Sequence, residues 1–210
     1  MCKFTTIILL CTMFFVFGGQ ISAQNTDIEL LRKINGVEAT VGCSKFISNT
    51  TTEVAIGIPV VLCGLSLIEK DDNMLKNALY IGASMGVDGV LTYSLKKVIN
   101  RPRPRETYAA GIIPYSPESS MSFPSGHTSL AFATATSLSL KYPKWYIVAP
   151  TYLWACSVGY SRMNLGVHYP SDVLAGAVLG AGSAFVTYKV NEWFWKKQEH
   201  KKLIGLYPYL

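Results

Sequence analysis

Three short clusters of polar residues hold the side chains of this sequence that can do chemistry. Together they supply three cations, two histidines, one carboxylate, and a serine beside a glycine. The clusters are Lys96 with Arg103-Pro104, Pro124-Ser125-Gly126-His127, and Ser161-Arg162 with His168 and Asp172. This set suits the transfer of a phosphoryl group without a metal ion, because it provides cations for the phosphate, a nucleophile and a proton donor.

The cations and donors of the set are typical of a phosphate site. In the transition state of phosphoryl transfer, negative charge spreads over three oxygens, so the protein must surround the group with preorganised cations and hydrogen-bond donors. Lys96, Arg103 and Arg162 are such cations, and the arginines have forked donors that match phosphate. The N–H of Gly126 can approach a phosphate closely because no side chain blocks it, and the Ser125 hydroxyl adds a donor. These five residues are predicted to bind the substrate.

The two histidines and the aspartate can carry the covalent chemistry. An imidazole can attack phosphorus or carry a proton near neutral pH. Asp172 follows His168 by four residues, so on a helix both side chains face the same way, and the carboxylate can keep one ring nitrogen protonated while the other attacks. We therefore predict His168 as the nucleophile, Asp172 as its orienting partner and His127 as the general acid.

The spacing of the clusters resembles the three-part signature of the type 2 phosphatidic acid phosphatase family. Six residues separate Lys96 from Arg103, five separate Arg162 from His168, and three separate His168 from Asp172. This family is similar to the bacterial acid phosphatases and the vanadium haloperoxidases and shares its site with them. The resemblance implies a helical bundle, a phosphohistidine intermediate on His168, and hydrolysis with neither a metal ion nor another cofactor.

Composition favours a single membrane-associated domain. The chain has 210 residues, of which 50% are hydrophobic and only 15% charged, and this balance is unusual for a soluble domain. The net charge of +6 does not indicate a nucleic-acid partner, because five of the nineteen basic residues lie in or beside the first cluster. The sequence also lacks a glycine-rich nucleotide loop and the spacing of metal ligands.

The first 23 residues have the pattern of an export signal. A short basic start is followed by an apolar run from Thr5 to Phe17 and by the small residues Ser22 and Ala23, which predicts cleavage before Gln24. The alternative is a first membrane helix that is not cleaved. Either reading of residues 1–23 places residue 24 outside the cytoplasm.

Residues 24–53 form a polar segment that is expected to lie on the periplasmic side. Ile28, Leu30, Leu31 and Ile34 recur at helical spacing, which predicts an amphipathic helix that packs on the bundle or lies at the membrane surface. A loop rich in serine, asparagine and threonine is expected at residues 48–52.

Residues 54–195 hold five apolar segments, and residues 196–210 form a basic tail. The segments cover residues 54–68, 74–95, 121–140, 145–160 and 173–188. With the leader, they predict an all-α bundle of five to six transmembrane helices, although some are shorter than the ~20 residues that a span requires. The second segment contains Asp88, which is expected to pair with a cation of the bundle.

Counting the crossings from an external residue 24 places all three clusters on one face. The turns at residues 69–73 and 141–144 and the basic tail then lie inside and carry lysines, as the positive-inside rule requires. Ser125-Gly126-His127 opens a helix, and helix N-termini favour anions. Gly176 and Gly180 continue the four-residue spacing of His168 and Asp172 and indicate close helix contact.

These observations predict a metal-independent phosphatase of the bacterial inner membrane whose site faces the periplasm. Relatives in the family act on undecaprenyl pyrophosphate, on the phosphate of lipid A, and on phosphatidic or phosphatidylglycerol phosphates. The alternatives are a soluble periplasmic acid phosphatase, a vanadium-dependent haloperoxidase, and a lipid-binding protein without activity. Arg101 and Arg105 fall outside the signature and are expected to face solvent or lipid headgroups. Asp172 is also a candidate helix N-cap.

Overall fold

The computed structural model describes the backbone of residues 20–206 and the side chains of residues 26–197, and the regular secondary structure of this part of the chain is all α-helix. The predicted leader lies almost wholly outside the described residues, so its cleavage stays a prediction. The described helices are α2 (Gln20–Ile34), α3 (Glu38–Asn49), α4 (Thr51–Glu69), α5 (Asp72–Ile99), α6 (Pro104–Thr107), α7 (Gly126–Lys141), α8 (Trp145–Asn164) and α9 (Pro170–Leu206). The all-α prediction is confirmed.

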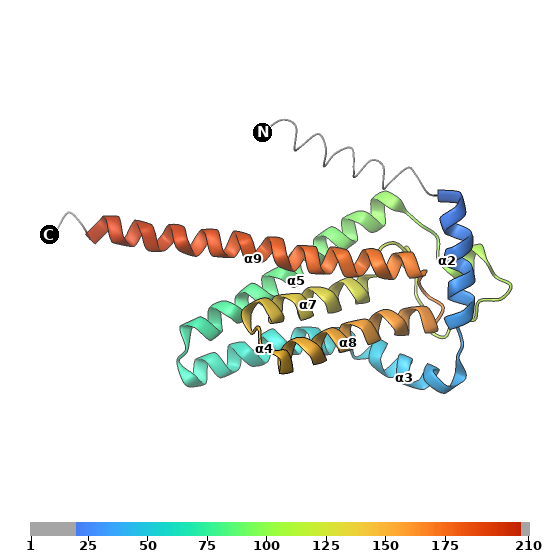
Figure 1. Cartoon of the computed structure of the whole chain (residues 1–210), viewed down its shortest axis with the longest axis horizontal. Helices are drawn as coiled ribbons and strands as arrows, with labels where there is room; N and C mark the ends of the chain where they lie inside the picture. The colour runs from blue at the N-terminus through green and yellow to red at the C-terminus, as the bar shows by residue number, and fades with distance from the viewer. Residues whose placement is uncertain (1–19, 207–210) are drawn as a thin grey trace, which may run out of the picture.

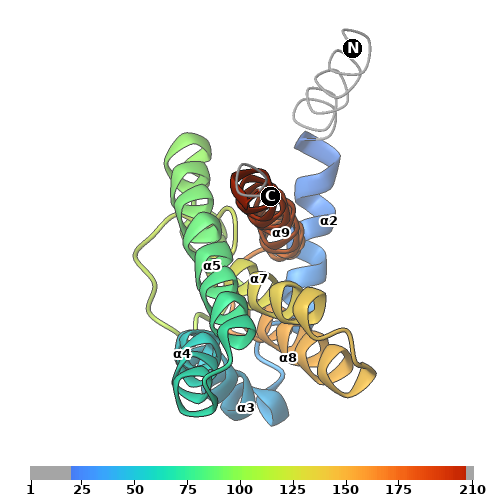
Figure 2. The same ribbon diagram turned by 90° about the vertical axis from the view of Figure 1, so that its left-hand side faces the viewer.

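The long helices α4, α5, α7, α8 and α9 run along one axis, and α2 stands across one end of this bundle (Figure 1). The helix α7 lies at the centre, because it packs against α9, α8 and α5 (Figure 2). The loop between α5 and α7 and the turn between α8 and α9 both lie at the end that α2 crosses. The clusters identified in the sequence are in these connections.

Close contact between α7 and α9 depends on two glycines, as the sequence predicted. A Cβ atom at Gly180 would lie 2.0 Å from the carbonyl oxygen of Ser129, and one at Gly176 would lie 2.6 Å from that of Ser125. No side chain fits at such distances, so only glycine allows the two backbones to approach this closely. The contact brings the start of α9 against the start of α7, where the Ser125 N–H donates to the Asp172 carbonyl oxygen at 3.1 Å.

The interior between α5 and α7 is polar. The Ser129 hydroxyl donates to Asp88 Oδ1 at 2.5 Å, and Thr92 donates to the Ser129 hydroxyl at 3.3 Å. Among the described side chains no cation pairs with Asp88, so the expectation of an ion pair is wrong. A hydroxyl of the neighbouring helix satisfies the carboxyl group instead.

The segment before the bundle contains two helices, and the predicted loop at residues 48–52 is wrong. Only Thr50 separates α3 from α4. The Thr50 hydroxyl donates to the Phe46 carbonyl oxygen at 2.8 Å, and the Thr51 hydroxyl donates to that of Ile47 at 2.7 Å. These bonds satisfy carbonyl groups at the end of α3, so the polar run continues the helical path instead of forming a loop.

Packing of α2 on the bundle agrees with its apolar spacing. Ile28 and Leu31 are buried in a cluster with Ile112 and Tyr169, whereas Leu30 is 46% exposed. The helix is therefore fixed across the end of the bundle by its apolar face.

Two of the described helices are long and apolar enough to cross a membrane, namely Thr51–Glu69 and the part Pro170–Lys197 of α9. Both expose large apolar side chains, such as Leu67 and Ile68 on α4 and Val178 on α9. The 16 residues of α7 reach only about 24 Å at 1.5 Å per residue, short of the ~30 Å hydrocarbon core. The number of five to six spans stays a prediction.

Candidate active site

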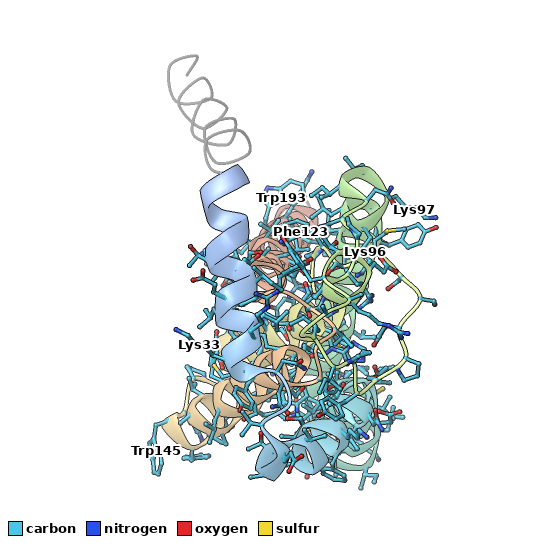
Figure 3. The ribbon with its side chains drawn as sticks, turned by 90° about the vertical axis from the view of Figure 1, so that its right-hand side faces the viewer. Lys33, Lys96, Lys97, Phe123, Trp145 and Trp193 are labelled. Atoms are coloured by element: carbon cyan, nitrogen blue, oxygen red, sulfur yellow. The ribbon has the colours of Figure 1, made fainter. Side chains whose placement is uncertain are left out.

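The three clusters come together at the end of the bundle that α2 crosses, as the sequence predicted, because Arg103 Nη1 lies 3.5 Å from His168 Nε2 and the Ser125 N–H donates to the Asp172 carbonyl oxygen. Figure 3 looks onto this end of the bundle and labels Lys96. Each cluster residue sits at or next to a helix terminus. Lys96 lies in the last turn of α5, Arg103 directly precedes α6, Ser125 directly precedes α7, Arg162 lies in the last turn of α8, and Asp172 lies in the first turn of α9. Helix ends carry unpaired backbone groups, so this arrangement suits a charged ligand.

Glu118 joins two of the predicted cations. Its Oε2 lies 3.4 Å from Arg103 Nη2, and its Oε1 accepts a hydrogen bond from Arg162 Nη2. Burial raises the pKa of Glu118, but the combined effect of the two guanidinium groups is larger and lowers it. The pKa therefore lies below its ordinary value, and the group is ionised at pH 7. Sequence reasoning missed this residue, because it lies in the long loop between two clusters and matches no motif.

Arg103 is buried and held on several sides. Its Nε donates to the Ser120 carbonyl oxygen at 2.6 Å, its Nη2 to the Ser120 hydroxyl at 3.0 Å, and its Nη1 to the Val167 carbonyl oxygen at 2.8 Å. The same Nη1 lies 3.5 Å from His168 Nε2. The guanidinium group is therefore fixed beside the histidine before any substrate binds.

Arg162 is 1% exposed and keeps one donor free. Its Nη1 donates to the Ser48 hydroxyl of α3 and its Nη2 donates to Glu118. Its Nε has no hydrogen-bond partner among the described residues. A buried donor without a partner is costly, so this N–H is available to an anionic ligand.

His168 is neutral near pH 7. It is 2% exposed, and burial lowers its pKa to about 4, although Asp172 acts in the opposite direction. Its Nδ1 lies 3.7 Å from Asp172 Oδ2, which is longer than a hydrogen bond, and Nδ1 has no other partner in the part of the chain that the structure describes. The predicted pair is thus brought together at van der Waals range, and a small movement would close the hydrogen bond.

Asp172 is fully buried and both of its carboxylate oxygens accept hydrogen bonds. Oδ2 accepts from the Ser122 hydroxyl at 2.5 Å and from the Tyr169 N–H at 3.0 Å, and Oδ1 accepts from Arg101 Nη1 at 2.6 Å. Asp172 is the third residue of α9 and not its N-cap. The N-cap prediction is wrong, because the carboxylate reaches back to the N–H of the residue before the helix.

The prediction that Arg101 is exposed is wrong. Its side chain is only 20% exposed, and it pairs with Asp172 and with Asp27 of α2. The connector folds back after α5, where Asn100 adopts a left-handed conformation and the Ser122 N–H donates to the Arg101 carbonyl oxygen at 2.9 Å. This turn directs Arg101 toward the start of α9. The other non-signature arginine, Arg105, is exposed as expected.

The start of α7 contributes backbone donors more directly than the Ser125 hydroxyl. That hydroxyl is fully buried and lies 2.8 Å from the Thr128 hydroxyl, so it already has a hydrogen-bond partner. Gly126 is the first residue of α7, and N–H groups in a first helical turn have no partner within the helix. A Cβ at Gly126 would meet Thr92 and Lys96 only at ordinary distances of 3.6 and 3.9 Å. Packing therefore does not require this glycine.

Lys96 and His127 complete the set. Lys96 Nζ donates to the Met121 carbonyl oxygen at 2.5 Å. Burial lowers the pKa of Lys96 to about 8, with Arg103 acting in the same direction and Asp172 opposing the shift. The half-buried His127 lies within electrostatic range of Arg162, Glu118 and Arg103. All the predicted site residues thus belong to one constellation.

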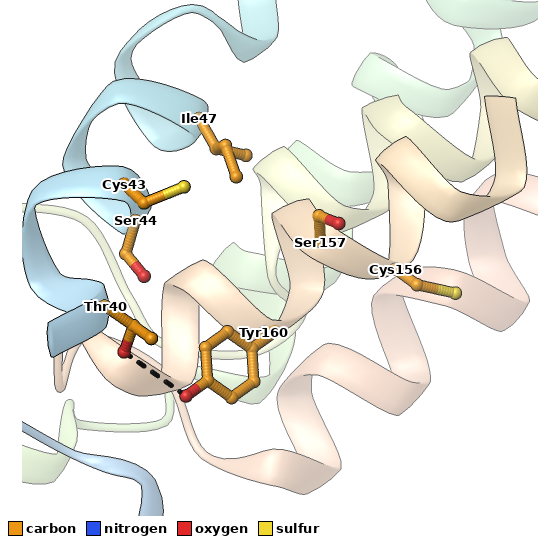
Figure 4. A pocket seen from close by; sticks show the side chains of 7 residues that line it. All are labelled: Thr40, Cys43, Ser44, Ile47, Cys156, Ser157 and Tyr160. Atoms are coloured by element: carbon orange, nitrogen blue, oxygen red, sulfur yellow. Dashed lines mark hydrogen bonds between the residues drawn. The ribbon is translucent and has the colours of Figure 1, made fainter. Parts of the chain in front are cut away.

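One cavity lies apart from this constellation. It has a volume of about 370 Å³, lies between α3 and α8, and is lined by Thr40, Cys43, Ser44, Ile47, Cys156, Ser157 and Tyr160 (Figure 4). It contains none of the cluster residues. Within the described part of the chain, no group of three or more histidine, cysteine and acidic side chains could hold a metal ion.

One family model matches most of this bundle. Residues 77–196 match the model of the PAP2 superfamily. The matched range contains all three clusters, whereas α2, α3 and α4 precede it.

Individual proteins show the same likeness. A lipid A 1-phosphatase of Rhizobium johnstonii is 32% identical over 51% of this chain, but the match spans only 45% of that protein. An undecaprenyl-diphosphatase of Sulfolobus acidocaldarius is 29% identical over 83% of this chain and 82% of its own length. The crystal structure of a transmembrane PAP2-type phosphatidylglycerolphosphate phosphatase from Bacillus subtilis has a TM-score of 0.71 and covers 91% of this chain and 97% of that one. At 24% identity this last likeness shows the fold alone.

Proposed function

Because the chain belongs to the PAP2 superfamily, we propose that it is a metal-independent phosphatase that removes phosphate from a membrane lipid. One observation carries this proposal above the others. His168 is buried and neutral, with Arg103 3.5 Å from one ring nitrogen and Asp172 3.7 Å from the other. A nucleophile for phosphorus requires this combination of an unprotonated nitrogen, an orienting carboxylate and a cation.

In the first step, Nε2 of His168 attacks phosphorus and the bond from phosphorus to the leaving oxygen breaks. Asp172 accepts the hydrogen bond of Nδ1–H and stabilises the positive charge that develops on the ring. Burial lowers the pKa of His127 to about 4, so His127 binds a proton together with the dianionic phosphate, whose charge favours the imidazolium, and then donates this proton to the leaving oxygen. In the second step, water attacks the phosphohistidine, His127 takes a proton from that water, and the bond between phosphorus and nitrogen breaks. The products are inorganic phosphate and the dephosphorylated lipid.

The phosphoryl oxygens take the place of the Glu118 carboxylate. Its carboxylate lies between Arg103 and Arg162, and a carboxylate presents two anionic oxygens much as a phosphate does. Lys96, the free Nε–H of Arg162 and the N–H groups of Gly126 and His127 supply further donors. Substrate binding then requires Glu118 to move away from the two arginines.

The apolar surface supports a lipid substrate. The helices α4 and α9 expose large apolar side chains, and both are long enough to cross a bilayer. The related proteins are named for lipid A, undecaprenyl diphosphate and phosphatidylglycerol phosphate. We propose a substrate from this group or phosphatidic acid, in which a phosphate is carried on a lipid at the membrane surface.

The site is proposed to face the periplasm from the inner membrane. Lysines stacked on aromatic rings mark the opposite end of the bundle, where Lys76 lies 4.7 Å from the Trp195 ring and Lys141 4.9 Å from the Tyr188 ring. Tryptophan and tyrosine are enriched at both membrane interfaces, whereas an excess of lysine and arginine is typical of the cytoplasmic side, and the lysines therefore favour the cytoplasm for this end.

Phosphate release by the purified protein in detergent tests the proposal. The panel is lipid A, undecaprenyl pyrophosphate, phosphatidic acid, phosphatidylglycerol phosphate and a soluble aryl phosphate, all with EDTA. We expect release from at least one lipid and its loss in His168→Gln, with Lys97→Gln, an exposed neighbour of Lys96, as the matched control. Equal release by His168→Gln would refute the mechanism, and preference for the aryl phosphate would indicate a soluble-ester phosphatase.

A further inference from the structure

The helix α2 lies outside the range that matches the PAP2 superfamily, yet one of its side chains reaches the predicted catalytic residues. Asp27 is buried, and its Oδ2 accepts from Arg101 Nη2 at 2.9 Å. Its Oδ1 accepts from the backbone N–H of Ser171 at 2.9 Å, and the Ser171 hydroxyl also donates to Oδ2. Asp27 therefore bonds both to Arg101 and to the residue directly before Asp172.

Arg101 connects this carboxylate to the second one. Its Nη1 donates to Asp172 Oδ1 at 2.6 Å and to the Ser171 hydroxyl at 2.7 Å. The guanidinium carbon lies 3.9 Å from the centre of the Tyr169 ring. The fork thus has a carboxylate on each side and an aromatic face beneath it, which fixes its plane.

The geometry at Asp172 gives this link a consequence for His168. Arg101 occupies Oδ1, while Oδ2 is the oxygen that faces His168 Nδ1. The Ser122 hydroxyl and the Tyr169 N–H hold Oδ2 itself, but without the bond to Oδ1 the carboxylate can tilt about its Cβ–Cγ bond, and Oδ2 then points less directly at the imidazole. Arg101 thus completes the set of bonds that orients Asp172.

Attachment of α2 does not depend on Asp27 alone. Ile28 and Leu31 are buried against Tyr169, and the Asn35 side chain bonds the backbone of Ile113 at 2.8 and 2.9 Å. The loss of the Asp27 charge therefore leaves these contacts intact, and the effect on the site can be separated from loss of the helix.

We propose that Asp27 and Arg101 are positioning residues for the catalytic Asp172, so that α2 forms part of the active site. This inference rests on the proposed function for its kinetic consequences. Asp27 holds Arg101, Arg101 holds Oδ1 of Asp172, and Oδ2 of Asp172 keeps the proton of His168 on Nδ1. Removal of the outer hydrogen-bond partners of metal-ligating histidines typically costs about 10- to 100-fold in metal affinity or activity, and we expect the same range for partners that orient a nucleophilic histidine.

Steady-state kinetics test the link on whichever lipid of the panel the wild-type protein hydrolyses. For Asp27→Asn we expect kcat to fall about tenfold and for Arg101→Gln about a hundredfold, with KM within about twofold, because the phosphate-binding cations are unchanged. In the double variant, we expect the Asp27 substitution to lower kcat by less than about twofold beyond the effect of Arg101→Gln, since Asp27 acts through Arg101. Glu29→Gln, an exposed carboxylate of the same helix, is the control and is expected to leave kcat unchanged.

Nitrogen NMR of the imidazole gives a readout that does not require turnover. The chain has three histidines, so His127→Gln and His200→Gln assign the signals of His168. We expect the proton on Nδ1 in the wild-type protein and a mixture of tautomers in Asp27→Asn and Arg101→Gln.

The two readouts separate this inference from the proposed function. A wild-type protein that is inactive on the whole panel would refute the function, and the tautomer comparison would still decide the positioning role. An unchanged tautomer in Arg101→Gln, or kcat unaffected by Asp27→Asn in an active protein, would overturn the inference. A double variant whose loss of kcat equals the product of the two single effects would overturn it as well.

Discussion

The lowered pKa of Lys96 leads to a specific pH dependence of activity. Burial lowers its pKa to about 8, so about half of the free protein has a neutral Lys96 at pH 8 and about nine-tenths at pH 9. Only the protonated amine attracts a phosphate. Because kcat/KM reports the ionisation of the free enzyme, we expect it to fall about tenfold for each pH unit above 8. A lysine with the ordinary value near 10.4 would leave kcat/KM flat to about pH 10.

Lys96→Arg distinguishes this explanation from other basic groups. A guanidinium stays protonated throughout the range, so the fall above pH 8 should disappear in the variant, even if the longer side chain lowers the rate at every pH. The assay is phosphate release in detergent between pH 6 and 10, with Lys97→Arg as the control that keeps the wild-type profile. A fall near pH 8 that persists in Lys96→Arg would refute the assignment of the basic limb to Lys96.

Four further predictions follow from the structure. Glu118→Gln removes the anion between the two arginines, so the inhibition constant of inorganic phosphate should fall about tenfold; a weaker inhibition would contradict displacement of this carboxylate. Gly180→Ala places a Cβ 2.0 Å from a carbonyl oxygen of α7 and should cost at least about 1–3 kcal/mol, seen as a melting temperature several degrees lower, whereas Gly182→Ala, with open space around it, should not. Gly126→Ala meets only ordinary contacts, so its melting temperature should match the wild type while kcat/KM falls. In the folded protein His168 has a pKa of about 4, below its value in the unfolded chain, so the unfolded chain binds more protons between about pH 6.5 and 4. The free energy of unfolding should therefore decrease as pH falls through this window, and it should decrease less in His168→Gln.

The residues of the motif clusters could be predicted because their spacing carries both identity and position. Lys96, Arg103 and Arg162 were expected on the same face of the bundle as His168, and the structure brings the two arginines together at Glu118 with Arg103 beside His168. Gly176 and Gly180 were expected at a close helix contact, and their missing Cβ atoms would overlap the backbone of α7. Such predictions succeed where one local sequence pattern determines both the helix on which a residue lies and the face of that helix.

Partners that arrive from distant segments could not be predicted in this way. Ser48, Glu118 and Asp27 each contact an arginine of the site across 44 or more positions of the sequence. Nothing in their local sequence distinguishes them from ordinary surface residues. Arg101 was expected at the surface for the same reason, since its two carboxylate partners become visible only once α2 and α9 are placed beside the connector.

The charges of the whole site explain why Glu118 should lie between the arginines when no substrate is bound. The described constellation contains four cations, Lys96, Arg101, Arg103 and Arg162, and three carboxylates, Asp27, Glu118 and Asp172. With His168 neutral, these seven residues carry a single excess positive charge. Burying uncompensated cations is costly, and Glu118 reduces this cost. When a phosphate dianion replaces Glu118 between the arginines, the constellation becomes neutral, so substrate and carboxylate exchange without leaving a large unpaired charge. A carboxylate that could not move from between the arginines would exclude the substrate. Without any carboxylate there, Arg103 and Arg162 would have no anionic partner.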